Sequence, residues 1–126
     1  MDLIASLQCA DQPGIVHAMT TAVLACGGNI IENQQFTDEP TNTFVMRTRF
    51  ETSQSLDAAR KSLTEGLSKF SPALHIRPTD EKPRALVLVT KESHCLRDLL
   101  YLLELGELPI EIPLIVSNHE DLRALV

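Results

Sequence analysis

The residues between the first apolar run and the first helical pattern are suited to hold a free amino acid. They read Asp11-Gln12-Pro13-Gly14-Ile15. We expect Pro13 at the first helical position, where its missing N–H is no loss, and Gly14 to let a ligand approach the backbone closely. The free N–H groups and the positive end of the helix dipole favour a carboxylate, and Asp11 would hold an ammonium group. A strand-to-helix turn with a suitable cap is the alternative.

Two other polar clusters, Ser93-His94-Cys95 and Ser117-Asn118-His119, each follow an apolar run in the second half of the chain. Open parallel sheets bind ligands at the carboxyl ends of their strands, so these clusters predict the wall of a substrate pocket. The residues expected to line it are His94, Cys95, Asn118 and His119. Helix capping by Ser93 and a turn at 117–119 are the alternatives.

No complete catalytic set is predicted among these residues. His94 and Cys95 are neighbours at a helix start and point in different directions, whereas an activated thiol needs its base within hydrogen-bonding reach. A metal site built from these two residues and His119 lacks both the ligand count and the spacing of a zinc centre. The sequence therefore predicts neither catalytic nor metal-binding residues in this chain.

Composition excludes several functions. The chain has 126 residues, 44% of them hydrophobic, which is enough for a packed core. Seventeen acidic and eleven basic residues give a net charge of -6, the wrong sign for binding nucleic acid nonspecifically. No apolar run approaches the roughly 20 residues that span a bilayer, and no signal-peptide pattern opens the chain. We expect a cytoplasmic protein with reduced cysteines and with neither a nucleic-acid nor a membrane partner.

Apolar periodicity in the first 80 residues predicts the order β-α-β-β-α-β. The expected strands are 3–9, 29–36, 43–51 and 73–77, and the expected helices are 15–26 and 56–70. Ser53 or Ser55 would cap the second helix, and Pro72 would end it. This order predicts an α+β, ferredoxin-like fold with both helices on one face of an antiparallel sheet. The other face or an edge stays uncovered, so we expect at least a dimer.

The stretch 78–83 is charged and flanked by prolines, which is typical of a linker. We place the linker at 81–83, between a domain at 1–80 and residues 84–126. The continuous apolar run 84–89 is typical of a parallel strand buried on both faces. A leucine-rich helix ended by Gly106 and an apolar strand at 110–116 follow, although Pro113 is unusual in a central strand. This β-α-β unit is too small to stand alone, and we expect it to be the truncated start of a Rossmann-like α/β domain.

The Asp11–Ile15 loop, together with Gly27-Gly28-Asn29-Ile30, resembles the ACT domain, a small βαββαβ regulatory module. Members of that family often pair their sheets and bind amino acids between them. The resemblance implies a homo-oligomer formed through the sheet and a small amino acid as effector. It adds Asn29 and Ile30 to the effector-binding residues.

The second half resembles the start of the formyltransferase-like domain of formyltetrahydrofolate deformylases. The matching motifs are Lys82-Pro83-Arg84, Ser93-His94-Cys95-Leu96, Asp98-Leu99-Leu100, Gly106-Glu107-Leu108-Pro109 and Ser117-Asn118-His119. The resemblance implies a hydrolase that converts 10-formyltetrahydrofolate and water to formate and tetrahydrofolate, supplying formate for purine synthesis. The folate is its substrate, and no cofactor is expected.

The catalytic residues of that family lie beyond residue 126, so the resemblance predicts that this chain alone is inactive. The alternative is a stand-alone amino-acid-binding regulatory protein without catalysis, which the complete ACT-like unit favours.

Overall fold

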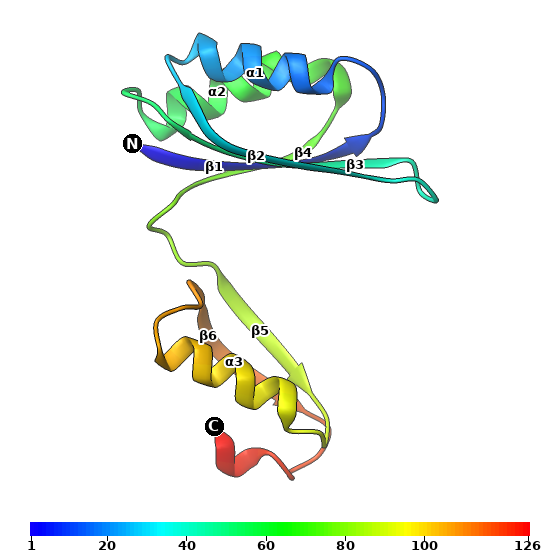
Figure 1. Ribbon diagram of the computed structural model, residues 1–126, viewed down its shortest axis with the longest axis vertical. Helices are drawn as coiled ribbons and strands as arrows, with labels where there is room; N and C mark the ends of the chain where they lie inside the picture. Colours follow the sequence, from blue (N-terminus) through cyan, green and yellow to red (C-terminus); the bar gives the residue numbers. More distant parts are fainter. The chain divides into compact units, whose positions relative to one another are not determined.

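The computed structural model describes residues 1–126, which divide into two compact units, Met1–Asp80 and Glu81–Val126 (Figure 1). Unit 1 is a four-stranded sheet with two helices on one face. Unit 2 is a pair of parallel strands with a helix on one face. No helix in either unit is both long enough and apolar enough to cross a lipid bilayer.

Unit 1 confirms the predicted βαββαβ order. Its elements are β1 (Asp2–Ala10), α1 (Ile15–Ala25), β2 (Asn29–Asp38), β3 (Thr43–Glu51), α2 (Leu56–Gly66), a 3₁₀ turn (Ser68–Phe70) and β4 (Ala73–Pro78). The strands lie in the order β2-β3-β1-β4, and all neighbours are antiparallel. Strands β2 and β4 are therefore the two edges of the sheet.

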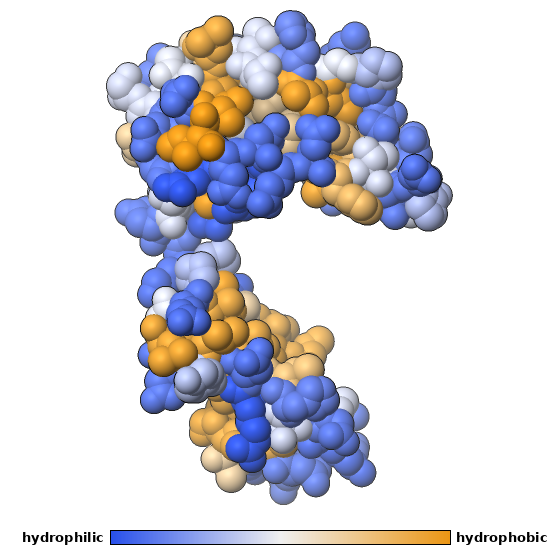
Figure 2. Space-filling model, viewed as in Figure 1, coloured by the Kyte–Doolittle hydropathy of each residue, from blue (hydrophilic) through white to orange (hydrophobic).

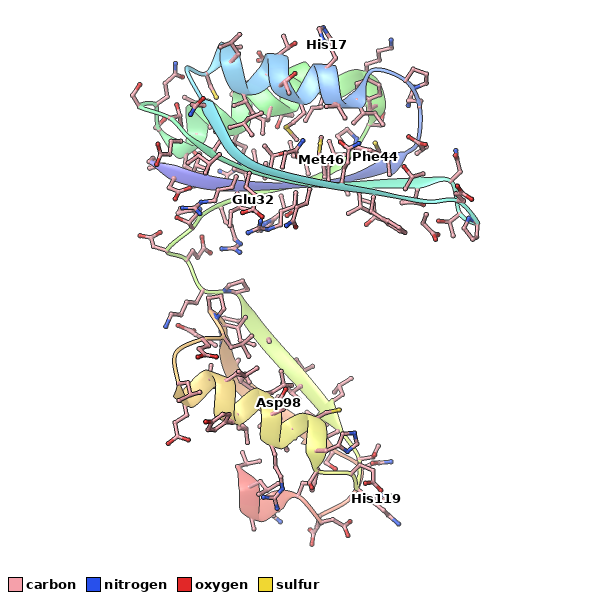
Figure 3. All side chains as sticks on the ribbon, in the orientation of Figure 1. His17, Glu32, Phe44, Met46, Asp98 and His119 are labelled. Carbon is pink, nitrogen blue, oxygen red and sulfur yellow. The ribbon has the colours of Figure 1, made fainter.

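The core of unit 1 forms because alternate strand residues face the helices. In β3, Phe44 and Met46 point toward the helices, whereas Glu32 of β2 points to the opposite, open face (Figure 3). In β1 the alternate residues are all buried in this core, namely Leu3, Ala5, Leu7 and Cys9. Ile4 lies on the opposite face by the same alternation but is also buried. It lies in register between Arg49 and Arg77, two residues with long side chains on the neighbouring strands.

Helix α2 begins where the sequence predicts and ends earlier. Ser55 is its cap, because the Ala58 N–H donates a hydrogen bond of 3.2 Å to the Ser55 hydroxyl. The helix ends at Gly66 rather than running on to Phe70, and a 3₁₀ turn follows. Gly66 packs so closely on α1 that an added Cβ would lie 2.7 Å from the Ala22 Cβ. The 3₁₀ turn that follows this contact between α1 and α2 still buries Phe70 in the core.

Unit 2 contains β5 (Arg84–Val89), α3 (His94–Glu104), β6 (Glu111–Ser117) and a terminal 3₁₀ turn (Arg123–Leu125). Strands β5 and β6 pair in parallel, as expected for a β-α-β unit. The pairing register shifts between Arg84 and Leu86, opposite the segment of β6 that contains Pro113. The strand therefore accommodates its proline at an irregularity, since proline cannot donate to the ladder.

In this chain β5 is buried on one face only. Leu86 and Leu88 are 58% and 72% exposed, and Leu114 and Val116 of β6 are exposed beside them. Helix α3 covers only the other face, where Leu96 is fully buried. A single helix cannot cover both sides of a sheet, so one apolar face of this unit stays open (Figure 2).

Candidate functional site

The loop between β1 and α1 is shaped by Gly14. Its backbone is left-handed, with φ of +97°, and Ile15 is the first helical residue. Pro13 therefore lies before the helix cap, and its expected place at the first helical position is wrong. The reason is that the turn into the helix needs a positive φ, which glycine adopts without a steric cost.

The same loop is anchored at the end of the sheet where β2 turns into β3. The Asp11 N–H donates to the Asn42 carbonyl at 2.9 Å. Asp11 is partly exposed, whereas Gln12, Pro13 and Gly14 are exposed. The Ile15 side chain is buried in the core, so only its backbone can face a ligand.

Asn29 and Ile30 lie at the opposite end of the sheet. Asn29 pairs with Glu51, which in turn pairs with Asp2, whereas Asp11 follows the last residue of β1. Eight or nine strand residues of about 3.3 Å each separate the two ends, a distance of about 25–30 Å. The structure therefore does not bring Asn29 and Ile30 to the Asp11 loop within one chain.

A cavity of about 470 Å³ opens in unit 2 where β5 and β6 end and α3 begins. It is lined by His94, Cys95 and Asn118, which the structure thus brings together from two loops. Thr90 and Glu92 also line it, and neither was predicted from the sequence. Their position directly after β5 was the available signal, because residues there belong to the same strand end as His94.

His119 lines a neighbouring cavity of about 370 Å³, which shares Val89 and Leu96 with the first. Residues 117–119 also form the turn that was the alternative prediction for this segment. The His119 N–H donates to the Ser117 hydroxyl at 3.1 Å, and that hydroxyl donates to the Thr90 carbonyl at 3.2 Å. These bonds hold the ends of β5 and β6 together and so shape both cavities.

The alternative role of Ser93 as a helix cap is not observed, since its side chain makes no cap hydrogen bond to α3. The first cavity offers an imidazole, a thiol, a carboxylate, an amide and a hydroxyl. Such groups bind polar parts of a ligand while apolar walls exclude water. No cluster of three or more His, Cys, Asp or Glu side chains in the chain is placed to hold a metal ion.

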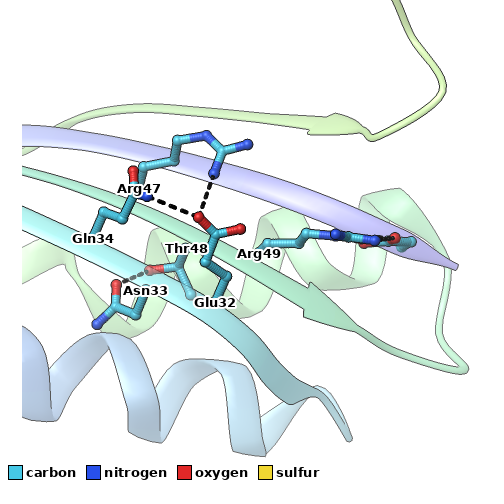
Figure 4. Close-up of polar contacts among 7 residues, drawn as sticks. Glu32, Asn33, Gln34, Arg47, Thr48 and Arg49 are labelled. Carbon is cyan, nitrogen blue, oxygen red and sulfur yellow. Dashed lines mark hydrogen bonds and ion pairs between the residues drawn. The ribbon is translucent and has the colours of Figure 1, made fainter.

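Two ion pairs cross the open face of the unit 1 sheet (Figure 4). Arg49 lies 2.6 Å from the Asp2 carboxylate, and Arg47 lies 3.7 Å from Glu32. The Glu32 carboxylate also accepts a bond of 2.9 Å from the Gln34 amide. Both arginines alternate with the buried residues of β3, so the sequence indicates their face but not their acidic partners.

Ion pairing and burial shift the pKa values of Asp2, Cys9 and Cys26. The hydrogen bonds from Arg49 hold the pKa of Asp2 below its usual value, although partial desolvation opposes the shift. Burial raises the pKa of the Cys9 and Cys26 thiols. Because the thiolate is the reactive form, these two cysteines are unreactive core residues.

No family model matches the chain. It is 36% identical over 126 residues to the formyltetrahydrofolate deformylase of Corynebacterium sp. (strain P-1), an alignment that covers 98% of this chain and 44% of that protein. It is 38% identical over 127 residues to the Bacillus subtilis (strain 168) deformylase, covering 95% of this chain and 41% of that protein. The chain thus spans about two fifths of the length of these curated relatives.

Solved structures give the same relationship. A formyltetrahydrofolate deformylase from Burkholderia mallei matches with a TM-score of 0.81 and 30% identity, over 98% of this chain and 44% of that one. An ACT domain protein from Streptococcus pneumoniae, 19% identical, matches 61% of this chain and 88% of its own with a TM-score of 0.54, a likeness of fold alone. Along nearly its whole length, therefore, the chain is a homologue of the N-terminal part of the formyltetrahydrofolate deformylases.

Proposed function

We propose that this chain is the N-terminal part of an enzyme that hydrolyses 10-formyltetrahydrofolate to formate and tetrahydrofolate. In that proposal residues 1–80 are a regulatory ACT domain, 81–83 a linker, and 84–126 the first part of the catalytic domain. The supporting observation is the alignment of both units with curated deformylases at 36–38% identity. The formate would feed purine synthesis, and the cytoplasmic location stays a prediction.

Hydrolysis of a formyl group requires a base that activates water and a donor that stabilises the oxyanion at the formyl carbon. We assign His94, Cys95, Asn118 and His119 to the wall of the substrate pocket and leave catalysis to residues outside this chain. The supporting geometry is the cavity of about 470 Å³ at the carboxyl ends of β5 and β6. The folate is the substrate in this scheme, and no cofactor is proposed.

A steady-state assay of tetrahydrofolate release tests the proposal. The 126-residue chain should show no turnover, whereas a longer natural form with about 150 further residues, enough for a complete α/β domain, should be active. In that active form Asn118→Ala should raise KM more than it lowers kcat, because the proposed role is binding. Comparable turnover by the short chain would instead make His94, Cys95 or His119 catalytic.

We also propose that the Asp11–Ile15 loop binds a small amino acid, with its carboxylate on the α1 N-terminus and its ammonium near Asp11. The left-handed, exposed Gly14 supports this site. Asn29 and Ile30 contribute only if a second chain supplies them, since they lie at the far end of the sheet. Calorimetric titration with the common amino acids should detect binding that Gly14→Val abolishes, and binding that survives this change would exclude the loop.

Self-association through the sheet of unit 1 is part of the proposal, because both helices lie on one face and the other is open. Sedimentation should show no persistent monomer at micromolar concentration. The second candidate function, an amino-acid-binding regulator without catalysis, is favoured by the complete βαββαβ unit. Amino-acid binding by a natural form that lacks all deformylase activity would establish it.

A further inference from the structure

The side chain of Ser117 joins β5 and β6 just beyond their last backbone pair. Ser117 is the last residue of β6 and lies in register with Val89, the last residue of β5. Its hydroxyl donates a hydrogen bond of 3.2 Å to the carbonyl of Thr90, which directly follows β5. Thr90 lines the cavity of about 470 Å³, so this bond holds the two strands together at the mouth of that cavity.

The same hydroxyl fixes the turn that follows β6. It accepts a hydrogen bond of 3.1 Å from the His119 N–H, and a serine hydroxyl can donate one bond while it accepts another. His119 lies at this end of unit 2 (Figure 3), and its Nδ1 is 2.8 Å from the Asn118 carbonyl oxygen. Because a carbonyl can only accept, Nδ1 carries the proton in this contact. Hydrogen bonds therefore fix the backbone around Asn118.

Asn118 depends on this turn more than the other predicted residues of the cavity do. His94 and Cys95 are the first two residues of α3, so the helix holds their backbone in place. Asn118 lies in an exposed bend, and residues 118–120 belong to neither a helix nor a strand. The position of its amide is therefore set by the hydrogen bonds of the turn.

We propose that Ser117 is a positioning residue of the substrate cavity, and that its hydroxyl holds the Asn118 amide where the substrate binds. This inference rests on the proposed function, in which Asn118 belongs to the wall of the folate pocket. Ser117 is not among the residues that line the cavity of about 470 Å³, so its effect on binding passes through its neighbours.

A purely structural role is the alternative, and exposure argues against it. Both hydrogen bonds of the Ser117 hydroxyl lie at exposed positions. Water can replace a lost partner there, so the bonds contribute little to the free energy of unfolding. Water does not reproduce the fixed direction of these bonds, and the position of Asn118 is lost without them.

Steady-state kinetics of the longer natural form provide the first test. Ser117→Ala should raise KM for 10-formyltetrahydrofolate about tenfold and change kcat less than about twofold, because the role is in binding. Ser117→Thr keeps the hydroxyl and should restore most of the lost affinity. Ser93→Ala is the matched control, since Ser93 lies in the same unit, makes no cap bond and does not line the cavity.

A double-mutant cycle tests whether Ser117 acts through Asn118. Asn118→Ala alone should raise KM, and adding Ser117→Ala to it should raise KM little further, because the positioned group is already absent. Two effects on KM that simply multiply would overturn the proposal.

Urea unfolding of the 126-residue chain, followed by the fluorescence of Tyr101, tests the structural alternative. Ser117→Ala should leave the midpoint of unit 2 nearly unchanged, and a large loss of stability would overturn the positioning role.

The outcomes separate this inference from the proposed function. A longer form with no deformylase activity would reject the proposed function and this role with it. An active form in which Asn118→Ala raises KM but Ser117→Ala does not would reject the positioning role alone.

Discussion

The two units of this protein cover their sheets to different extents. In unit 1 two helices cover one face, and seventeen buried residues form a continuous core. In unit 2 only Leu96 and Leu122 are buried, while both strands expose leucine or valine. The antiparallel sheet of unit 1 needs one apolar face covered, whereas a parallel sheet needs both. A helix layer on one face therefore completes the antiparallel sheet of unit 1 but leaves the parallel sheet of unit 2 half-covered.

The largest expected difference comes from leucine truncation. Leu7→Ala in unit 1 should lower the free energy of unfolding by about 3–5 kcal/mol, because it leaves a cavity in a packed core. Leu88→Ala in unit 2 should change it by less than about 0.5 kcal/mol, since that side chain is largely exposed.

Urea titration can follow each unit separately. Reaction of the buried thiols of Cys9 and Cys26 reports on unit 1, and the fluorescence of Tyr101, in a chain without tryptophan, reports on unit 2. Equal losses for the two leucines would mean that β5 is covered in solution.

Substitutions at two glycines distinguish the cost of steric crowding from the cost of backbone strain. A Cβ at Gly28 would lie 2.7 Å from the Val23 Cγ1 and 2.8 Å from the Val23 carbonyl oxygen, so Gly28→Ala should cost about 2–3 kcal/mol. Gly106 has nothing within 4 Å but a φ of +75°, so Gly106→Ala should cost about 1 kcal/mol.

Asparagine distinguishes the two causes. It tolerates a left-handed backbone, so Gly106→Asn should be milder than Gly106→Ala, whereas Gly28→Asn should be at least as severe as Gly28→Ala. The same urea titrations measure all four variants. A milder Gly28→Asn would contradict the steric explanation.

Removing the serine before each helix should give a smaller difference in stability between the two units. Ser55→Ala should destabilise unit 1 by about 1 kcal/mol, because the Ala58 N–H loses its acceptor. Ser93→Ala should leave unit 2 nearly unchanged, since Ser93 makes no side-chain cap bond. Thermal unfolding measured by circular dichroism compares the two, and a larger loss from Ser93→Ala would show that this serine does cap α3.

The smallest effect concerns pH. Arg49 lowers the pKa of Asp2 in the folded state, so this pair stabilises unit 1 above the usual carboxyl pKa. That contribution is lost as the pH falls through the lowered, folded value. Asp2→Asn should therefore make the urea midpoint of unit 1 less dependent on pH between about 5 and 2. Asp98→Asn, at an exposed position of α3, is the control and should leave that dependence unchanged.

The sequence by itself determined the order of elements and most of the core of unit 1. Alternating apolar residues in β1 and β3, and the helical spacing from Ile15 to Cys26, specify local structure through side-chain periodicity alone. The cap at Ser55 was likewise predictable, because the hydrogen bond spans only three residues. The homology of both units could be anticipated from short motifs, since each motif lies within one loop or helix end.

Only the tertiary structure decided which distant residues meet. Sheet register placed Asn29 far from Asp11, set Asp2 beside Arg49, and put Phe36 in one row with Ala73. The gathering of Glu92, His94 and Asn118 around one cavity depends on the parallel pairing of β5 with β6. Asp2 and Arg49 are 47 positions apart along the chain, and Arg84 of β5 is 27 positions from its partner Glu111, so no local pattern encodes these contacts. The register of long-range pairing is set by burial of the whole sheet. The sequence could therefore indicate which loops carry the site residues but not which of these residues lie together.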